Sequence, residues 1–172
     1  KRIPSILPPM SRKEQIELSK IYSVCGLFEE RGDLLDIRPF RAPHHTVTPQ
    51  GLSGGGRIPK PGEISLASGG VLFLDELPEF DRSAMETLRQ PLEDGTVTIS
   101  RVSAALTYPC SITLIAAMNP CPCGYYGHPT KKCTCSENQV RRYLGKVSGP
   151  MLDRLDLHVE VPPVDYRSLS GE

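Results

Sequence analysis

Hydrophobic and polar positions along the chain predict strands that alternate with helices. Two stretches are continuously apolar: VLFL at 71–74 runs into Asp75 and Glu76, and SITLIAAM at 111–118 runs into Asn119. Continuous apolar runs of this length are typical of strands buried on both faces of a parallel sheet. LHVEVPPV, at 157–164, predicts a last short strand.

Three stretches carry the signal of a helix N-terminus. In each, a Ser is followed three residues later by Glu or Gln, the pattern of a capping box. The three pairs are Ser11 with Glu14, Ser83 with Glu86, and Ser136 with Gln139. Gly26 and Gly95 are stop signals for the first two, so the sequence predicts helices within 11–26, 83–95 and 136–145.

The remaining stretches predict loops and one hairpin. Residues 38–63 are dense in Pro and Gly and predict mostly loop, with a short strand at 43–47. TVTISR at 96–101 alternates apolar and polar residues, and 102–109 can return it as a hairpin. Strands alternating with helices predict an α/β layered domain.

Composition places few limits on the partner. The chain has 172 residues, enough for one compact domain, with 20 Lys and Arg against 20 Asp and Glu. Bulk charge therefore favours no partner, and any nucleic-acid contact needs a local basic patch. No apolar stretch reaches the length of a membrane span and no signal segment opens the chain, so we expect a cytoplasmic protein without a membrane partner. The first residue is Lys1 rather than Met, which we interpret as an excised domain.

Asp75 and Glu76 are the first candidates for chemistry. Ligands of open α/β sheets bind beyond the carboxyl ends of the strands. An acid at the end of a buried strand can hold Mg²⁺ beside nucleotide phosphates, and a second acid can activate the attacking water. Asn119, at the end of the other buried strand, would contact the same water or the terminal phosphate. The alternative is that both acids are solvated turn residues.

Four cysteines lie close together in CPCGYYGHPTKKCTC, residues 121–135. Cys121 with Cys123, and Cys133 with Cys135, form two C-x-C pairs. Four thiolates can close a tetrahedral structural zinc site, which favours zinc, although C-x-C is tighter than the common spacing. His128 is an alternative ligand, and free thiols or disulfides are the alternatives to a metal. Cys25 and Cys110, which stand alone, are expected to be ordinary buried thiols.

Weaker signals remain elsewhere. Arg154, between Asp153 and Asp156, is either a surface ion-pair residue or an arginine finger for a neighbouring subunit. His44 and His45 favour packing or turn hydrogen bonds over metal binding. Arg101 and the segment SGGGRIPK at 53–60 suggest polymer contacts only loosely.

Five segments together resemble the bacterial ComM/YifB family, the Mg-chelatase-like branch of the AAA+ ATPases. They are RPFRAPHHTVT, GEISLASGGVLFLDELPEF, LRQPLEDGTVTISR, AAMNPCPCGYYG and GPMLDRLDL. The resemblance covers essentially residues 1–172 and implies one partial AAA+ domain, a P-loop NTPase core with a parallel sheet flanked by helices, with the Cys-rich loop 121–135 inside it.

The resemblance also implies roles for residues. VLFLDE becomes the Walker B strand, with Asp75 on Mg²⁺ and Glu76 activating water for ATP hydrolysis. Asn119 becomes the sensor-1 residue, in contact with nucleotide, and Arg154 the arginine finger. The 53–60 segment and the 96–109 hairpin would face the pore of a homo-hexameric ring. Family members of the ComM kind are associated with DNA branch migration in natural transformation, and chelatase relatives drive metal insertion into porphyrin.

The sequence departs from the family pattern in one respect that matters for activity. No G-x-x-x-x-G-K-[ST] phosphate loop occurs in it, and the helical lid of the family is also missing. We therefore expect these residues alone to bind ATP poorly and not to hydrolyse it. We also expect the 111–118 strand to have an open edge that LHVEV or a second copy would cover. The alternatives to a DNA motor are the motor subunit of a magnesium-chelatase-type complex and a zinc-stapled binding module without catalysis.

Overall fold

The computed structural model describes residues 3–28, 33–56, 58–100 and 105–162. The chain forms two compact units, 1–118 and 119–172, and each is described by itself. The expectation that a single ATPase domain spans 1–172 stays a prediction.

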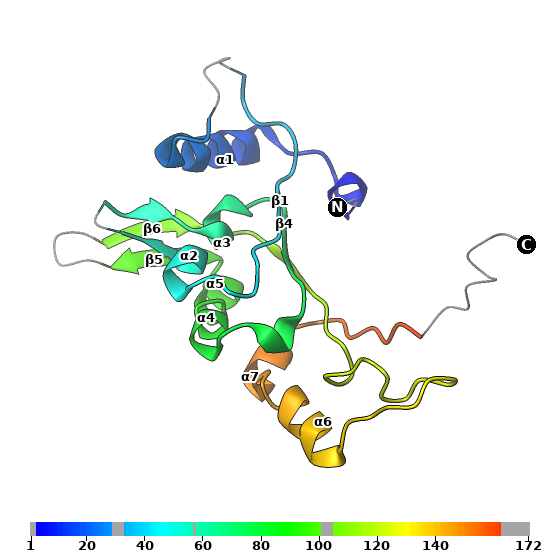
Figure 1. Cartoon of the computed structure of the whole chain (residues 1–172). Coiled ribbons are helices and arrows are strands. Elements are labelled where there is room, and N and C mark those ends of the chain that lie inside the picture. The colour runs from blue at the N-terminus through cyan, green and yellow to red at the C-terminus, as the bar shows by residue number, and fades with distance from the viewer. Residues whose placement is uncertain (1–2, 29–32, 57, 101–104, 163–172) are drawn as a thin grey trace, which may run out of the picture. The chain divides into compact units, whose positions relative to one another are not determined.

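A parallel sheet lies at the centre of the first unit (Figure 1). Its order is β1 (Phe40–Arg41), β4 (Val71–Leu74), β7 (Thr113–Ala116), and both pairs are parallel. Leu74 is in register with Ala116, so the carboxyl ends of β4 and β7 lie next to each other. The α/β class with a parallel sheet and flanking helices is confirmed, and it is consistent with a P-loop AAA+ core.

The two predicted buried strands differ in exposure. In β4, three of the side chains are fully buried, as its apolar run predicts. β7 is half-buried or exposed along its length, because β4 is its one strand partner among the described residues. The predicted open edge on the 111–118 strand is therefore present among the described residues of the first unit.

Helices and two hairpins surround the sheet. The helical elements of the first unit are η1 (Ile3–Ile6), α1 (Arg12–Cys25), α2 (Pro49–Ser53), α3 (Glu63–Leu66), η2 (Leu77–Glu79), α4 (Arg82–Glu86) and α5 (Arg89–Asp94). The antiparallel pairs are β2 (Gly54–Gly55) with β3 (Lys60–Pro61), and β5 (Thr96–Ser100) with β6 (Ala105–Pro109). The second pair confirms the predicted hairpin, whereas Arg101 and Arg57 lie outside the described residues.

Apolar side chains from separate elements form the core of the first unit. Those without solvent exposure include Leu52, Ile64, Leu72, Leu74 and Leu88. Burying each such side chain stabilises the fold by about 1.5–3 kcal/mol relative to leaving it in water. Gly70 allows the segment before β1 to approach β4 closely, since a Cβ there would overlap the carbonyl oxygen of Pro39.

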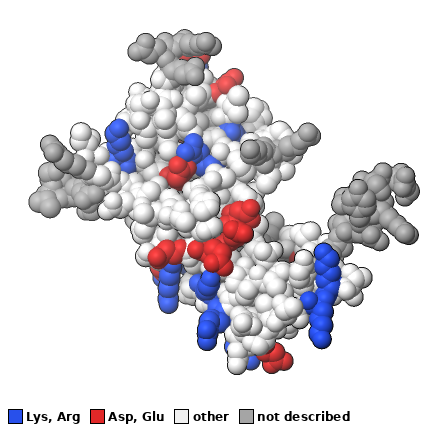
Figure 2. Space-filling model, in the orientation of Figure 1, with Lys and Arg blue, Asp and Glu red and all other residues white. Residues whose placement is uncertain are grey.

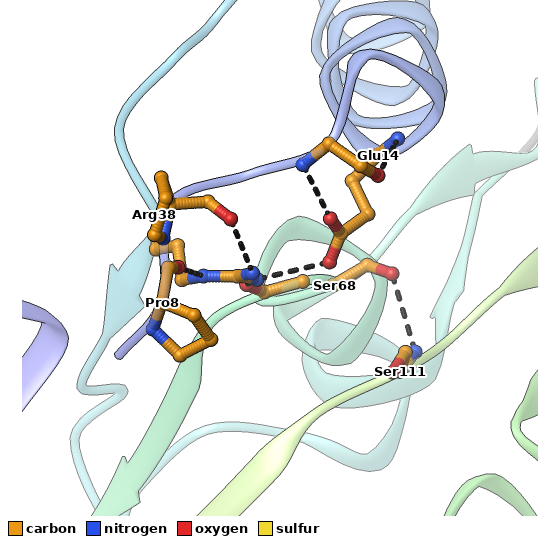
Figure 3. Close-up of polar contacts among 8 residues, drawn as sticks. Pro8, Glu14, Arg38, Ser68 and Ser111 are labelled. Carbon is orange, nitrogen blue, oxygen red and sulfur yellow. Dashed lines mark hydrogen bonds and ion pairs between the residues drawn. The ribbon is translucent and has the colours of Figure 1, made fainter. Parts of the chain in front are cut away.

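Arg38 connects three segments of this unit (Figure 3). Its Nε donates to the carbonyl oxygen of Pro8 at 2.5 Å, and its Nη1 donates to Glu14 Oε1 at 3.1 Å and to the carbonyl oxygen of Gly69. Glu14 closes the predicted capping box, because its Oε2 accepts from the Ser11 amide at 2.7 Å. The start of α1 is thereby tied to the segment that leads into β4.

The second unit contains α6 (Glu137–Leu144) and α7 (Gly149–Leu152), which follow the Cys-rich loop. The predicted capping box of Ser136 and Gln139 is present. The buried side chains of the second unit are Cys121, Val140, Tyr143, Val147 and Met151. No helix among the described residues of either unit is both long enough and apolar enough to cross a membrane.

Three predictions of elements are wrong. Asp81, not Ser83, caps α4, because its carboxylate accepts from the Ser83 amide at 2.8 Å. Residues 43–47 form no strand, and the Val47 amide donates to the carbonyl oxygen of His44 at 2.9 Å, which closes a turn. LHVEV forms no strand in its described residues, and Leu157, Val159 and Val161 are 80–85% exposed. The expectation that LHVEV covers the open edge of β7 is therefore wrong, and pairing with a second copy stays a prediction.

Candidate functional site

Asp75 and Glu76 lie at the carboxyl end of the central strand, as the sequence predicts. Backbone hydrogen bonds to Ala117 bracket the pair: the Ala117 amide donates to Leu74 at 2.9 Å, and the Leu77 amide donates to Ala117 at 2.9 Å. Both acidic residues are exposed, whereas Leu74 and Leu77 on either side are buried. The buried neighbours fix the backbone, and the two carboxylates reach solvent where a ligand of an α/β sheet binds.

Glu76 has a strained backbone. It is the one non-glycine residue with a positive φ among the described residues, with φ 54° and ψ 47°. Its amide donates to Asp75 Oδ1 at 3.0 Å, which also orients the Asp75 carboxylate. A side chain in the left-handed region costs about 1–3 kcal/mol and persists where the surroundings hold it, most often at functional sites.

His45 contacts Glu76, a contact that the sequence interpretation missed. The Nδ1 of His45 lies 3.5 Å from Glu76 Oε2. The His45 ring packs edge-on against Phe80 at 6.4 Å between centroids, and it lies tilted against the ring of His44 at 4.0 Å. The signal was available: His45 follows β1, the neighbour of β4, and the ends of neighbouring parallel strands meet at one edge.

His44 behaves as the sequence predicts. Its Nδ1 lies 3.0 Å from the Thr46 hydroxyl and 3.4 Å from the Thr46 amide nitrogen, the geometry of a turn. This turn places the His45 ring between His44 and Phe80, within reach of Glu76. His45 is therefore held by packing on one side and by a carboxylate on the other.

The other two residues of the predicted nucleotide site lie in the second unit. Asn119 is exposed and follows the end of β7 by three residues. Arg154 follows α7 and is half-buried, and its Nη1 donates to the carbonyl oxygen of Pro150 at 2.5 Å. Their roles toward nucleotide stay predictions, as does the approach of Asn119 to Asp75.

The four cysteines of the second unit gather into one cluster. The Sγ atoms of Cys121, Cys123, Cys133 and Cys135 all lie within 4.8 Å of one another. Cys121 is 3.4 Å from Cys123 and 3.8 Å from Cys133, and Cys123 is 3.6 Å from Cys133. Four sulfurs around zinc, each at about 2.3 Å, are separated by about 3.8 Å, so the cluster has the dimensions of a zinc site. These separations are much longer than a disulfide bond, and all four thiols are free.

The crowded thiols perturb one another. Backbone amides of Thr134 and Tyr125 lower the pKa of Cys123 to about 5. At Cys133 the amide of Cys135 acts in the same direction, but burial and the thiols of Cys123 and Cys121 outweigh it and raise the pKa to about 12. A metal binds the thiolate form, so a bound divalent metal would favour release of the proton that Cys133 otherwise retains.

His128 does not belong to the cluster. Its Nδ1 accepts from the amides of Thr130 at 3.2 Å and Lys131 at 3.1 Å, which folds the loop between the two C-x-C pairs. With four sulfurs in place, His128 is not needed as a ligand. Cys110 is buried as expected, and burial raises its pKa to about 12. Cys25 is half-exposed, with burial again the main cause of a raised pKa.

Comparison with known proteins identifies relatives that match nearly the whole chain. The YifB protein of Salmonella typhimurium is 48% identical over 161 residues, 94% of this chain and 31% of the relative. The competence protein ComM of Haemophilus influenzae is 49% identical over 172 residues, 99% of this chain and 33% of the relative. The chain thus spans about a third of the length of these curated relatives.

A more distant similarity reaches the chelatases. The 67 kDa magnesium-chelatase subunit of Heliobacterium mobile is 33% identical over 79 residues, 46% of this chain and 12% of the relative. The family described as magnesium chelatase, subunit ChlI, matches residues 1–169, which include the β4 acids and the cysteine cluster. The chain therefore belongs to the magnesium chelatase subunit ChlI family, with ComM and YifB proteins among its relatives.

Proposed function

We propose that this chain is part of the catalytic core of an ATP-hydrolysing AAA+ motor that works as a homo-hexameric ring on DNA. The observation that carries the proposal is the Asp75–Glu76 pair at the carboxyl end of β4, with Glu76 in a strained conformation. Family membership supports the same chemistry. The rest of the motor, including a phosphate loop, is expected from parts of the full-length protein outside these residues.

The two carboxylates have different roles in this proposal. Asp75, oriented by the Glu76 amide, offers its oxygens to Mg²⁺, a hard cation that prefers such ligands. When bound together with ATP, Mg²⁺ would offset the negative charge of the phosphate groups. Glu76 accepts the proton of the attacking water at its carboxylate, and His45 orients that carboxylate. Asn119 contacts the terminal phosphate, and Arg154 of a neighbouring subunit balances the charge that develops on it.

The test is ATP hydrolysis by the full-length protein. Glu76→Gln removes the proton acceptor and keeps the shape, so kcat is expected to fall by about 100-fold or more while ATP still binds. Asp75→Asn is expected to lower the affinity for Mg²⁺, so that half-maximal hydrolysis requires a higher Mg²⁺ concentration. Glu79→Gln, three residues after Glu76, is the matched control and keeps the wild-type rate. Hydrolysis at the wild-type rate by Glu76→Gln would contradict the proposal.

DNA is the partner that we favour, and a chelatase complex is the second candidate. A competence protein is 49% identical over 99% of this chain, whereas two chelatase subunits are 33% and 28% identical over 46% and 68% of it. Binding of the full-length protein to DNA is expected to weaken by about tenfold or more between 50 and 200 mM salt, because phosphate contacts release counterions. A protein without DNA affinity at low salt would favour the chelatase-type motor.

We also propose that the cysteine cluster binds one structural Zn²⁺. The sulfur separations carry this proposal, since they fit four Zn–S bonds. The metal would fix a loop that has a single fully buried residue, Cys121, to hold it in place. The cluster is closed by four thiolates, which is typical of structural rather than catalytic zinc.

A further inference from the structure

We infer that the loop between the two C-x-C pairs, residues 124–132, is a contact surface for single-stranded nucleic acid. The inference rests on the proposed function, and it assigns the DNA contact to a particular loop. We call residues 124–132 the contact loop. Single-strand binding surfaces combine exposed aromatic rings, on which bases stack, with cationic side chains that follow the phosphates.

The contact loop presents two aromatic rings at a turn. Tyr125 is 37% exposed and Tyr126 is 55% exposed. Gly124 and Gly127 flank the pair with φ of 80° and 76°, and nothing lies within 4 Å of a Cβ at either position. The two glycines thus make a tight turn in open space, where large apolar side chains gain nothing from a core. The two exposed rings are therefore available for stacking with the bases of a ligand.

Cationic side chains accompany the rings. Lys131 Nζ lies 5.0 Å from the centroid of the Tyr125 ring, and the ring of His128 meets Tyr125 edge-on at 5.7 Å. Lys132 follows and is also exposed. The amides of Thr130 and Lys131 donate to His128 Nδ1, so the basic segment is held beside the rings before any ligand arrives. Such preorganisation lowers the entropy lost on binding.

The charge around the contact loop favours a polyanion. No Asp or Glu occurs between Asp94 and Glu137, although the chain has 20 acidic residues in 172. On the face shown in Figure 2, Lys and Arg side chains adjoin Asp and Glu side chains in several places, so the basic character of this loop follows from its own sequence. Within 119–146, Glu137 is the one acid, against the basic residues Lys131, Lys132, Arg141, Arg142 and Lys146. An acidic partner surface or a nucleic acid fits this composition, and the exposed rings favour the nucleic acid, since its bases can stack on them.

The test is binding of the full-length protein to a 20-nucleotide oligo-dT at several salt concentrations. Tyr126→Ala is expected to weaken binding by about fivefold or more, whereas Tyr126→Phe, which keeps the ring, restores it. The double substitution Lys131→Gln with Lys132→Gln is expected to reduce the slope of log K against log salt by about 1.4, at about 0.7 for each phosphate contact. Binding to a duplex of the same length is expected to respond less to Tyr126→Ala, because paired bases cannot stack on the ring.

Controls separate this inference from loss of the fold and from failure of the proposed function. Lys13→Gln with Lys20→Gln changes the net charge equally on exposed positions of α1 and is expected to leave the salt slope unchanged. Each contact-loop variant should keep its zinc. If the zinc-loaded variants bind oligo-dT as the wild type does, or if duplex and single strand respond equally, the contact loop is not the site and the motor proposal stands. If the wild type has no DNA affinity, the contact-loop inference and the assignment of DNA as the partner are both wrong. ATP hydrolysis by the full-length protein then tests the ATPase part of the proposal separately.

Discussion

At the scale of single residues, Glu76 combines an unfavourable backbone with an exposed carboxylate. A left-handed conformation suits Gly, and Glu76 receives little packing in return, since its side chain is 55% exposed. Evolution toward stability alone would favour Gly at this position. We interpret the strain as the consequence of aiming a carboxylate from the end of β4 toward His45 and solvent.

The strain predicts an unusual order of stabilities for two variants. Glu76→Gly should be more stable than Glu76→Ala by about 1 kcal/mol, because a Cβ is unfavourable in the left-handed region. The free energy of unfolding in urea measures the difference. The control is position 20, inside α1, where Gly should be less stable than Ala by about 1 kcal/mol. If Ala is the more stable variant at both positions, Glu76 is not strained.

The residues that sequence reasoning located best are those with a local signature. Asp75 and Glu76 follow an apolar run, and the four cysteines are closely spaced in the sequence. The acidic pair at the end of the strand and the cysteine cluster were therefore both predicted. His45 was missed as a partner of Glu76, because the contact depends on β1 and β4 being neighbours although 29 residues separate them in the sequence. Strand order is a tertiary property that a residue pattern does not contain.

At the scale of elements, the start of α1 depends on ionised Glu14 (Figure 3). Hydrogen bonds with Ser11, followed by the contact with Arg38, lower the pKa of Glu14 from 4.5 to about 2. The carboxylate is charged in the folded protein at pH values where the unfolded chain is already protonated. Its contribution to stability is therefore complete above pH 4.5 and is lost as the pH falls toward 2.

The pH dependence can be measured on Glu14→Gln. The wild type should lose stability relative to this variant as the pH falls from 4.5 to 2, and the difference between them should be constant above pH 5. Urea unfolding at pH 3, 4, 5 and 7 measures it. Parallel curves for the two proteins over the whole range would show that Glu14 does not titrate abnormally.

The cysteine cluster leads to a prediction about the zinc content of the purified protein. The purified protein should contain one zinc per chain, and Cys133→Ser should lower its affinity for zinc strongly, because three thiolates leave the tetrahedral site open. Elemental analysis and competition with a chelator measure both. Cys25→Ser, outside the cluster, is the matched control and keeps full occupancy. Equal zinc loss in both variants, or no zinc in the wild type, would contradict the assignment.

Element prediction succeeded at two local signals and failed where a competing acceptor or strand pairing decided the structure. Both capping boxes at Ser11 and Ser136 are present, because an N-cap is formed within four residues. The third failed since Asp81, two residues earlier, offers a stronger acceptor than Ser83. LHVEV has the composition of a strand, but a strand of five residues is stable only when a neighbour pairs with it.

At the scale of the whole molecule, the proposed motor divides each active site between two subunits. In this proposal, Glu76 would act from the subunit that binds ATP, and Arg154 would act on the nucleotide of the neighbouring subunit. A ring is the closed assembly that a head-to-tail interface of this kind produces. The shared site makes a prediction that no monomeric enzyme can satisfy.

Mixing two inactive variants of the full-length protein tests this most directly. Rings of Glu76→Gln alone or of Arg154→Ala alone lack one essential group at every site and should hydrolyse ATP at a few per cent of the wild-type rate or less. In rings assembled from equal amounts of both, about a quarter of the interfaces contain an intact Glu76 and an intact Arg154. The account predicts recovery of ATP hydrolysis to about a quarter of the wild-type rate. A mixture no more active than its separate components would contradict it.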